Sequence, residues 1–314
     1  MVYDPYLNRG HVPVLLKETI ASLKPSKGDV AVDLTLGRGG HALEIGKIIE
    51  STKENPRLYG IDLDYENIEF AKKIINENNV HISTHHGSFI EWSRTLEDKN
   101  QTADVLFADL GVCSTHLDCP SKGFSFMSDG PLDMRLNQKQ SRTAADILKE
   151  YSVEEIKNMI TDFGEEPLAR RIAEKIGQTR LFEPILRTSQ LAKIVEEAYG
   201  TRAKKSKRHP STRTFMALRI AVNDELTALQ VLLNDIFTHA RRKKGALAPN
   251  ARIGFITFHS LEDRIVKRSF REFQKSGLGL ASSKIITATK EETKVNPRAT
   301  SAKLRSFIFK GIKN

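Results

Sequence analysis

Short apolar runs alternate with helical patterns along most of this chain. Helical patterns separate the first four runs, which is typical of a parallel sheet with helices on both faces. We therefore expect an α/β fold built on a doubly wound, mostly parallel sheet. Two late runs could close that sheet as an antiparallel edge pair, Lys284–Thr289 and Leu304–Phe309. The five main strand-like runs are Val30–Leu34, Leu58–Asp62, Val80–Thr84, Asp104–Asp109 and Arg252–Phe258.

Between residues 116 and 212 the apolar positions follow a helical period. Ser152 and Glu155 form a capping-box pattern ahead of an apolar face that ends at Gly164. A long amphipathic helix from Phe215 to Phe237 then returns the chain to its last central strand. These patterns predict a small helical domain at residues 116–212. The sheet domain around it would comprise residues 1–115 and 213–314.

The loop after the first strand is the most informative one, since Asp33–His41 reads DLTLGRGGH. Glycine has no Cβ and accepts positive φ, so backbone can approach a ligand closely there. The second strand ends at Asp62, which can accept hydrogen bonds from both ribose hydroxyls of a nucleotide-like cofactor. The spacing is G-x-G-G, and Asp33 lies four residues before the first glycine. This spacing favours S-adenosylmethionine over a dinucleotide, whose pyrophosphate needs a cradle at a helix N-terminus.

Further candidates follow strands at the same sheet edge, where ligands bind in open α/β sheets. Asp109 ends the fourth strand, and could contact the cofactor or accept a hydrogen bond from an amino group being methylated. His259 follows the fifth strand, and could be a base, a substrate ligand or a hydrogen-bonded core histidine. The loop 123–135 includes Asp133 and Arg135 among aromatic residues. Such a loop could contact substrate, or its aromatic side chains could simply anchor it.

The formal net charge of +10 indicates a polyanionic partner. A first basic cluster has no acid within it and comprises Arg202, Lys204, Lys205, Lys207, Arg208 and Arg213. A second basic run covers residues 241–244. We expect the first cluster to contact nucleic acid phosphates, and a solvated basic surface is the alternative.

The composition also excludes several classes. The mean hydropathy is −0.38 and no apolar run approaches the length of a membrane span, so no membrane association is expected. The N-terminal residues lack the features of a signal peptide, so we expect a cytoplasmic protein. The two cysteines, Cys113 and Cys119, predict neither a zinc site nor a disulfide framework.

The order of these motifs resembles that of the bacterial 16S ribosomal RNA cytosine-N4 methyltransferases of the MraW or RsmH type. GFSFMSDGPLDMR and FHSLEDRIVK are the most specific of the matching motifs, and the resemblance covers nearly the whole chain. The other matching motifs are HVPVLLKE (11–18), GRGGH (37–41), HGSF (86–89), DLGV (109–112), HPSTRTFMALRIAVNDEL (209–226) and NPRA (296–299).

The resemblance implies a class I methyltransferase sheet with an inserted helical domain that helps to bind the substrate. It implies methyl transfer to N4 of one cytidine in 16S rRNA of the small ribosomal subunit, with S-adenosylmethionine as the cofactor. The implied cofactor residues are Gly39, Gly40, His41, Asp62, Phe89 and Asp109. A further family contact is a glutamine whose position here is His116, and an imidazole cannot donate and accept from the same end of the side chain as a carboxamide does.

The catalytic residue is not settled by the sequence. Many amino-methyltransferases have an Asp/Asn-Pro-Pro-aromatic motif after the fourth strand, whereas this chain has DLGV. Asp109 and His259 therefore remain candidate proton acceptors. The candidate RNA-binding residues are Asp133, Arg135, Lys204, Lys205, Lys207, Arg208 and Arg213. Another Rossmann-type enzyme and a non-catalytic RNA-binding module are the alternative functions, and a homodimer is left open.

Overall fold

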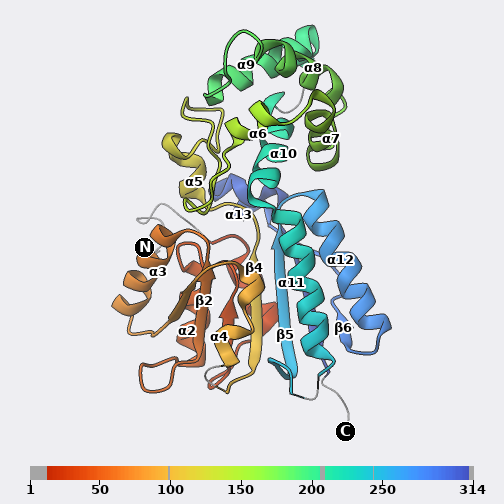
Figure 1. Ribbon diagram of the computed structural model, residues 1–314. Coiled ribbons are helices and arrows are strands. Elements are labelled where there is room, and N and C mark those ends of the chain that lie inside the picture. The colour runs from red at the N-terminus through yellow and green to blue at the C-terminus, as the bar shows by residue number, and fades with distance from the viewer. Residues whose placement is uncertain (1–12, 98–99, 206–208, 243, 311–314) are drawn as a thin grey trace. The chain divides into compact units, whose positions relative to one another are not determined.

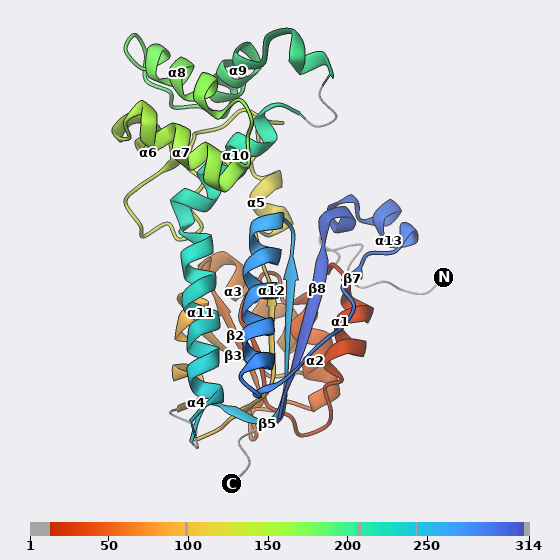
Figure 2. The ribbon, with the colours of Figure 1, turned by 90° about the vertical axis from the view of Figure 1, so that its right-hand side faces the viewer.

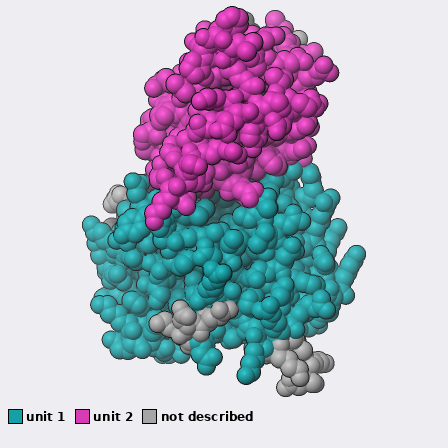
Figure 3. All heavy atoms as spheres, in the orientation of Figure 1, with its two compact units in different colours: residues 1–111, 226–314 teal, residues 112–225 magenta. Residues whose placement is uncertain are grey.

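The computed structural model describes residues 13–97, 100–205, 209–242 and 244–310 of the chain. The chain divides into two compact units, shown in Figure 3. Unit 1 comprises residues 1–111 and 226–314, and unit 2 comprises residues 112–225. The sequence pattern places the two boundaries at 115/116 and 212/213. The second boundary lies later in the structure because the helix at residues 211–223 contributes Phe215 and Leu218 to the core of unit 2.

Unit 1 is built on one mostly parallel sheet with the strand order β3-β2-β1-β4-β5-β8-β6, and β7 also pairs with β8. The pairs among β1 to β5 are parallel, and β8 is antiparallel to β5, β6 and β7. The expected fold class is thus confirmed. The strands are β1 Ala31–Asp33, β2 Leu58–Asp62, β3 Ser83–His86, β4 Ala103–Asp109, β5 Leu247–Thr257, β6 Gly279–Ala281, β7 Ile286–Thr287 and β8 Lys303–Phe309.

Helices cover both faces of this sheet (Figures 1 and 2). Along β4, Leu106 belongs to the core under α11 and α12, whereas Val105 and Phe107 belong to the core under α1, α2 and α3. Strands that are buried on both faces are expected in a parallel sheet. The helices of unit 1 are α1 Leu16–Leu23, α2 Gly40–Ile49, α3 Tyr65–Glu77, α4 Arg94–Glu97, α11 Glu225–Ala240, α12 Ser260–Lys275 and α13 Lys290–Val295. Its short 3-10 helices are η2 Phe89–Glu91 and η5 Pro297–Ser301.

Two strand predictions need correction. The third strand was expected at residues 80–84, but β3 begins at Ser83, because Val80 and Ile82 pack into the core beside α3 without joining the ladder. The late strands were expected to form an edge pair. The two runs do pair antiparallel, as β7 and β8. However, β8 lies inside the sheet between β5 and β6, and the edge strand β6 was missed.

Unit 2 is helical and surrounds its own apolar core. The predicted capping box is confirmed at the start of α7, where the Ser152 hydroxyl accepts from the Glu155 N–H and the Glu155 carboxylate accepts from the Ser152 N–H. The helices are α5 Ser114–Asp118, α6 Ala144–Glu150, α7 Val153–Gly164, α8 Ala169–Thr179, α9 Thr188–Tyr199 and α10 Ser211–Asn223. Its 3-10 helices are η3 Pro120–Lys122 and η4 Gly200–Lys205.

The prediction of a single long helix from Phe215 to Phe237 is wrong. The chain forms α10 and α11, which are separated at Asp224 by a left-handed backbone conformation with φ 50° and ψ 38°. The Asn223 side chain donates to the Met134 carbonyl and accepts from the Leu136 N–H, and these bonds hold the end of α10 to a neighbouring loop. Within the described ranges, none of the helices combines the length and apolar character that a membrane span requires.

Candidate functional site

The candidate site lies where the central strands of unit 1 end. Asp33, Asp62 and Asp109 are the last residues of β1, β2 and β4. Strands β2 and β4 both pair with β1, so the three carboxylates share one edge of the sheet. The chain reverses its strand order between β1 and β4, and this is the position where open α/β sheets bind ligands.

The glycine loop after β1 is tied to the end of β2. The Leu36 N–H donates to the Ile61 carbonyl over 2.8 Å, and the Gly37 N–H donates to Asp62 Oδ2 over 2.7 Å. Gly37 has a φ of 50°, in the region that favours glycine. The loop therefore reaches Asp62 through backbone that no bulky residue could form cheaply.

The next two glycines allow α2 to begin in close contact with its neighbours. Gly39 has a φ of 77°, and a Cβ there would lie 3.0 Å from the Cβ of Ala71 in α3. A Cβ on Gly40 would lie 2.3 Å from Pro13 Cγ. Both glycines named as cofactor candidates are thus required by packing as well as by any ligand.

The Asp62 carboxylate is held by backbone on both of its oxygens. Oδ2 accepts from Gly37, and Oδ1 accepts from the Asp64 N–H over 2.8 Å. Phe89 lies in η2, shortly after the end of β3. Gly87, between β3 and η2, donates its N–H to the Asp62 carbonyl over 3.0 Å. Asp62 and the Phe89 segment are therefore joined at the same end of β2.

His41 is buried in the first turn of α2 with its ring beside Phe107. Its Nε2 lies 2.9 Å from the Val14 carbonyl oxygen. Because a carbonyl oxygen only accepts, Nε2 carries the hydrogen of the neutral ring, and Nδ1 is then the nitrogen without one. That Nδ1 lies 3.8 Å from Asp109 Oδ2, so two of the predicted cofactor residues come together here.

Asp109 has a partly buried side chain, 18% exposed. Its N–H donates to Thr35 Oγ1 over 2.6 Å, whereas its carboxylate Oδ1 has no hydrogen-bond partner among the described residues. Burial raises the pKa of Asp109 well above its usual range, and the nearby charges of Asp33 and Glu262 raise it further. Asp109 is thus an acid that ionises reluctantly, and its Oδ1 is enclosed without a hydrogen-bond partner among the described residues.

Asp33 and Thr35 complete this group of polar residues. Neither was predicted from the sequence as a site residue. Asp33 is 2% exposed, and its Oδ1 accepts from the Thr35 N–H over 3.1 Å. Burial raises the pKa of Asp33 to about 7, the Thr35 hydrogen bond opposes this rise, and the charge of Asp62 adds to it. The only sequence signal was an acid at the end of a buried strand, just before a glycine loop.

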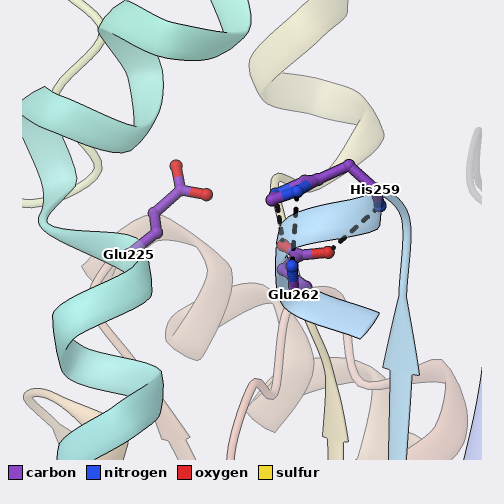
Figure 4. Close-up of side chains that lie close together, drawn as sticks. All are labelled: Glu225, His259 and Glu262. Carbon is purple, nitrogen blue, oxygen red and sulfur yellow. Dashed lines mark hydrogen bonds and ion pairs between the residues drawn. The ribbon is translucent and has the colours of Figure 1, made fainter. Parts of the chain in front are cut away.

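His259 caps the start of α12 (Figure 4). Its Nδ1 accepts from the Glu262 N–H over 3.5 Å, and its Nε2 lies 3.1 Å from Glu262 Oε1. Glu262 Oε2 also accepts from the Phe258 N–H over 2.8 Å. Both ring nitrogens therefore face Glu262, which gives His259 a role in the structure whatever its part in chemistry.

The remaining candidates belong to unit 2. His116 lies in α5, buried, with its ring centroid 5.4 Å from that of Phe124. Arg135 forms a two-point ion pair with Asp133, in which Nε lies 2.8 Å and a terminal nitrogen 2.7 Å from the carboxylate oxygens. The side chain of Arg213 is 44% exposed and lies 4.0 Å from Glu166.

The first basic cluster is only partly described. The backbone of Lys204 and Lys205 ends η4. Lys207 and Arg208 lie outside the described residues. The expected contact between this cluster and phosphates therefore stays a prediction.

Comparison with known proteins gives a consistent picture. A model of the MraW methylase family matches residues 8–310. A protein of Halothermothrix orenii named Ribosomal RNA small subunit methyltransferase H is 39% identical over 312 residues, covering 94% of this chain and 97% of its own length. Proteins of the same name from Syntrophotalea carbinolica and Heliobacterium mobile are 40% and 37% identical, and the matches cover 95% and 94% of this chain and 97% of each relative.

The raised pKa of Asp33 predicts a specific dependence of stability on pH. An acid whose pKa is raised by folding binds its proton more tightly in the folded chain. Its contribution is therefore fully present below pH 3.8 and is lost as the pH rises toward about 7. The loss amounts to about 1.4 kcal/mol per pH unit across that window.

We expect Asp33→Asn to remove this slope while its Oδ1 still accepts from Thr35. Denaturant unfolding from pH 4 to pH 8 should show the variant gaining about 2–4 kcal/mol over the wild type by pH 8. Asp104→Asn, at the opposite end of the sheet, is the control and should keep the wild-type slope. Parallel curves for the Asp33→Asn variant and the wild type would contradict the raised pKa.

Proposed function

Because this chain belongs to the MraW methylase family, we propose that it methylates the N4 amino group of a cytidine in 16S rRNA of the small ribosomal subunit, using S-adenosylmethionine. The names of its relatives support small-subunit rRNA as the substrate. The observation that carries the proposal is the glycine loop fixed to Asp62 beside Asp109 at the sheet edge.

The residues at this edge fit S-adenosylmethionine. Gly37 and Gly39 let the backbone run close to a ligand, and Asp109 Oδ1 is an acceptor without a partner among the described residues. A carboxylate has about four lone-pair directions, so Asp62 can receive ribose hydroxyls after its two bonds to backbone. Gly39, Gly40, His41 and Phe89 would complete the site in unit 1, and the His116 contact implied by the family resemblance stays a prediction.

The weak nucleophilicity of the target nitrogen determines what the protein must supply. The N4 lone pair of cytosine is delocalised into the ring, so the amine is a weak nucleophile. S-adenosylmethionine supplies a methyl group on a sulfonium, which is a good leaving group. The chain must therefore align the amine, exclude water and accept a hydrogen bond, and then a proton, from the nitrogen. The base must also be turned out of its stack to reach the site.

Asp109 is the acceptor that we propose first. Its Oδ1 is buried without a hydrogen-bond partner among the described residues, and it would have to be uncovered to meet the amine. Burial makes its ionised form a stronger base than an exposed carboxylate. His259 is the second candidate. Its Nδ1 accepts from the Glu262 N–H, whereas its Nε2, 3.1 Å from Glu262 Oε1, has no hydrogen-bond partner among the described residues. It ranks second because it already caps α12.

Unit 2 is proposed to bind the RNA. Lys204, Lys205, Lys207, Arg208 and Arg213 would contact phosphates, and the sequence around them contains no acid. Asp133 neutralises much of the charge of Arg135, which also donates to the Gln140 carbonyl. We therefore assign this pair the task of holding the loop shape, with the remaining N–H groups of Arg135 facing the RNA.

Small ribosomal subunits incubated with the protein and methyl-labelled S-adenosylmethionine should acquire about one label per particle. Digestion of the 16S rRNA to nucleosides should place that label in N4-methylcytidine. A label in another nucleoside would contradict the cytidine assignment, and no label in either subunits or free rRNA would contradict the function. Calorimetry with NAD and S-adenosylmethionine tests the alternatives, since a dehydrogenase would bind NAD and a plain RNA-binding module would bind neither.

Replacing Asp62 should weaken cofactor binding. Asp62→Ala removes the charged acceptor proposed for the ribose, and we expect a loss of about 1.5–3 kcal/mol, roughly tenfold to a hundredfold in Kd, by calorimetry with S-adenosylmethionine. Asp104→Ala is the matched control. It removes a carboxylate that accepts from the Val30 N–H in the same sheet, away from the glycine loop. Equal affinity of the Asp62 variant and the wild type would remove the cofactor assignment.

Single-turnover rates with saturating cofactor separate the two proposed acceptors. Asp109→Asn should slow methyl transfer by about 10²–10⁴-fold, the usual range for general-base assistance. His259→Ala should cost about 0.5–2 kcal/mol of folding stability through the lost cap, with a rate near that of the wild type. The opposite pattern, a slow His259 variant and a fast Asp109 variant, would assign proton acceptance to His259.

A further inference from the structure

The outer part of α12 carries a stripe of basic residues. Each of them lies three or four positions from another, which places them along one side of the helix. Residues 264 and 275 are separated by about 17 Å at 1.5 Å per residue. The members of this α12 stripe are Arg264, Lys267, Arg268, Arg271 and Lys275.

A cavity of about 320 Å³ opens beside the middle of this stripe. Lys267 and Arg271 line it from α12, and Arg305 lines it from β8. Phe270 and Ile285 supply apolar surface, and serine hydroxyls from the β6 and β8 region supply hydrogen-bonding groups. Every residue that lines it is neutral or basic, and its volume is within the range of small-ligand sites.

Among the described residues, only one of the three cationic side chains that line the cavity has an acidic partner. Arg305 is fixed by Asp263, whose oxygens lie 2.7 and 3.1 Å from its Nε and a terminal nitrogen. Burial opposes the lowering of the Asp263 pKa, but the bond to Arg305 and the charges of Arg305 and Lys303 keep it below its usual value. In contrast, neither Lys267 nor Arg271 forms an ion pair with any residue in the described part of the chain. The cavity thus presents two uncompensated cations beside a third that is held in place.

One exposed apolar residue, Ile285, lines the cavity, and two others nearby belong to the other face of the sheet. Leu280 and Ile308 are about half exposed and pair directly across β6 and β8. The neighbouring pair, Ala281 and Phe307, includes the Phe307 that packs with Phe270 of α12. Because side chains alternate along a strand, Leu280 and Ile308 point away from α12. Apart from Ile285, the face with the stripe is therefore polar and basic, which suits a polyanion better than a membrane surface.

We propose that the α12 stripe and its cavity bind phosphates of the rRNA substrate, with one nucleotide of the RNA seated against Lys267 and Arg271. This assignment rests on the proposed function. Helix α12 begins directly after His259, at the carboxyl end of β5, and runs back along the sheet (Figure 2). RNA bound there would extend from the site edge of the sheet along the outer side of α12.

The test compares two pairs of substitutions that remove equal charge from unit 1. The test variant is Lys267→Gln with Arg271→Gln, which keeps much of each aliphatic stem. The control variant is Lys72→Gln with Lys73→Gln, on α3. Binding to small ribosomal subunits is measured from 50 to 300 mM salt, with calorimetric affinity for S-adenosylmethionine and thermal stability measured in parallel.

The test variant should bind subunits about tenfold more weakly at low salt. The slope of log K against log salt should shrink by about 1.4–1.8, since each lost phosphate contact contributes roughly 0.7–0.9. The control should keep the wild-type slope, and cofactor affinity should not change in either variant. Exchanging the two cations as Lys267→Arg with Arg271→Lys should restore binding.

Two results would overturn the assignment. One is an unchanged salt slope in the test variant. The other is normal subunit binding together with lost binding to vesicles of phosphatidylglycerol, which would make the surface a lipid site. A different result would contradict the proposed function. A wild-type protein that binds subunits without methylating them would contradict the reaction, and the salt slopes would still decide the role of α12.

Discussion

The hydrogen bond from the Gly37 N–H to the Asp62 carboxylate is the constraint on which the rest of the site depends. It joins the loop after β1 to the end of β2. The second oxygen of the same carboxylate accepts from Asp64, which itself caps α3 by accepting from the Glu66 N–H. Loop, strand end and helix start are therefore fixed together. A ligand that meets Asp62 meets a group whose orientation the backbone has already set, so little order has to be gained on binding.

The buried acids at this edge come at a cost in stability. Asp33 and Asp109 end neighbouring strands, and burial raises the pKa of both. Thr35 links them, since its N–H donates to one and its hydroxyl accepts from the N–H of the other. A core made for stability alone would have apolar residues at these positions. Their presence is consistent with a site in which acceptors in a poorly solvated setting matter more than folding energy.

The sequence allowed the main features of unit 1 to be predicted, because a buried strand, a glycine loop and an acid at the end of β2 are local signals. The wrong predictions concern features that depend on contacts between residues far apart in the sequence. Val80 and Ile82 resembled a strand because they are buried, but backbone pairing falls to the polar residues of β3. The apolar period continued through Asp224, so one left-handed residue between two helices left no trace in it. The importance of Asp33 depends on neighbours that only folding brings together. The basic residues of α12 are dispersed in the sequence and gather only on the helix.

The two places where the chain passes between its units share one property. Gly111, the last residue of the first segment of unit 1, has a φ of 96°, and Asp224, next to the last residue of unit 2, has a φ of 50°. Glycine occupies such conformations at the smallest cost, asparagine and aspartate occupy them more often than most residues, and β-branched residues are disfavoured there. In evolution, the helices of unit 2 are then free to diverge in sequence. The two junction residues are not free to diverge. A β-branched residue at either position would be selected against, whatever the sequence of unit 2.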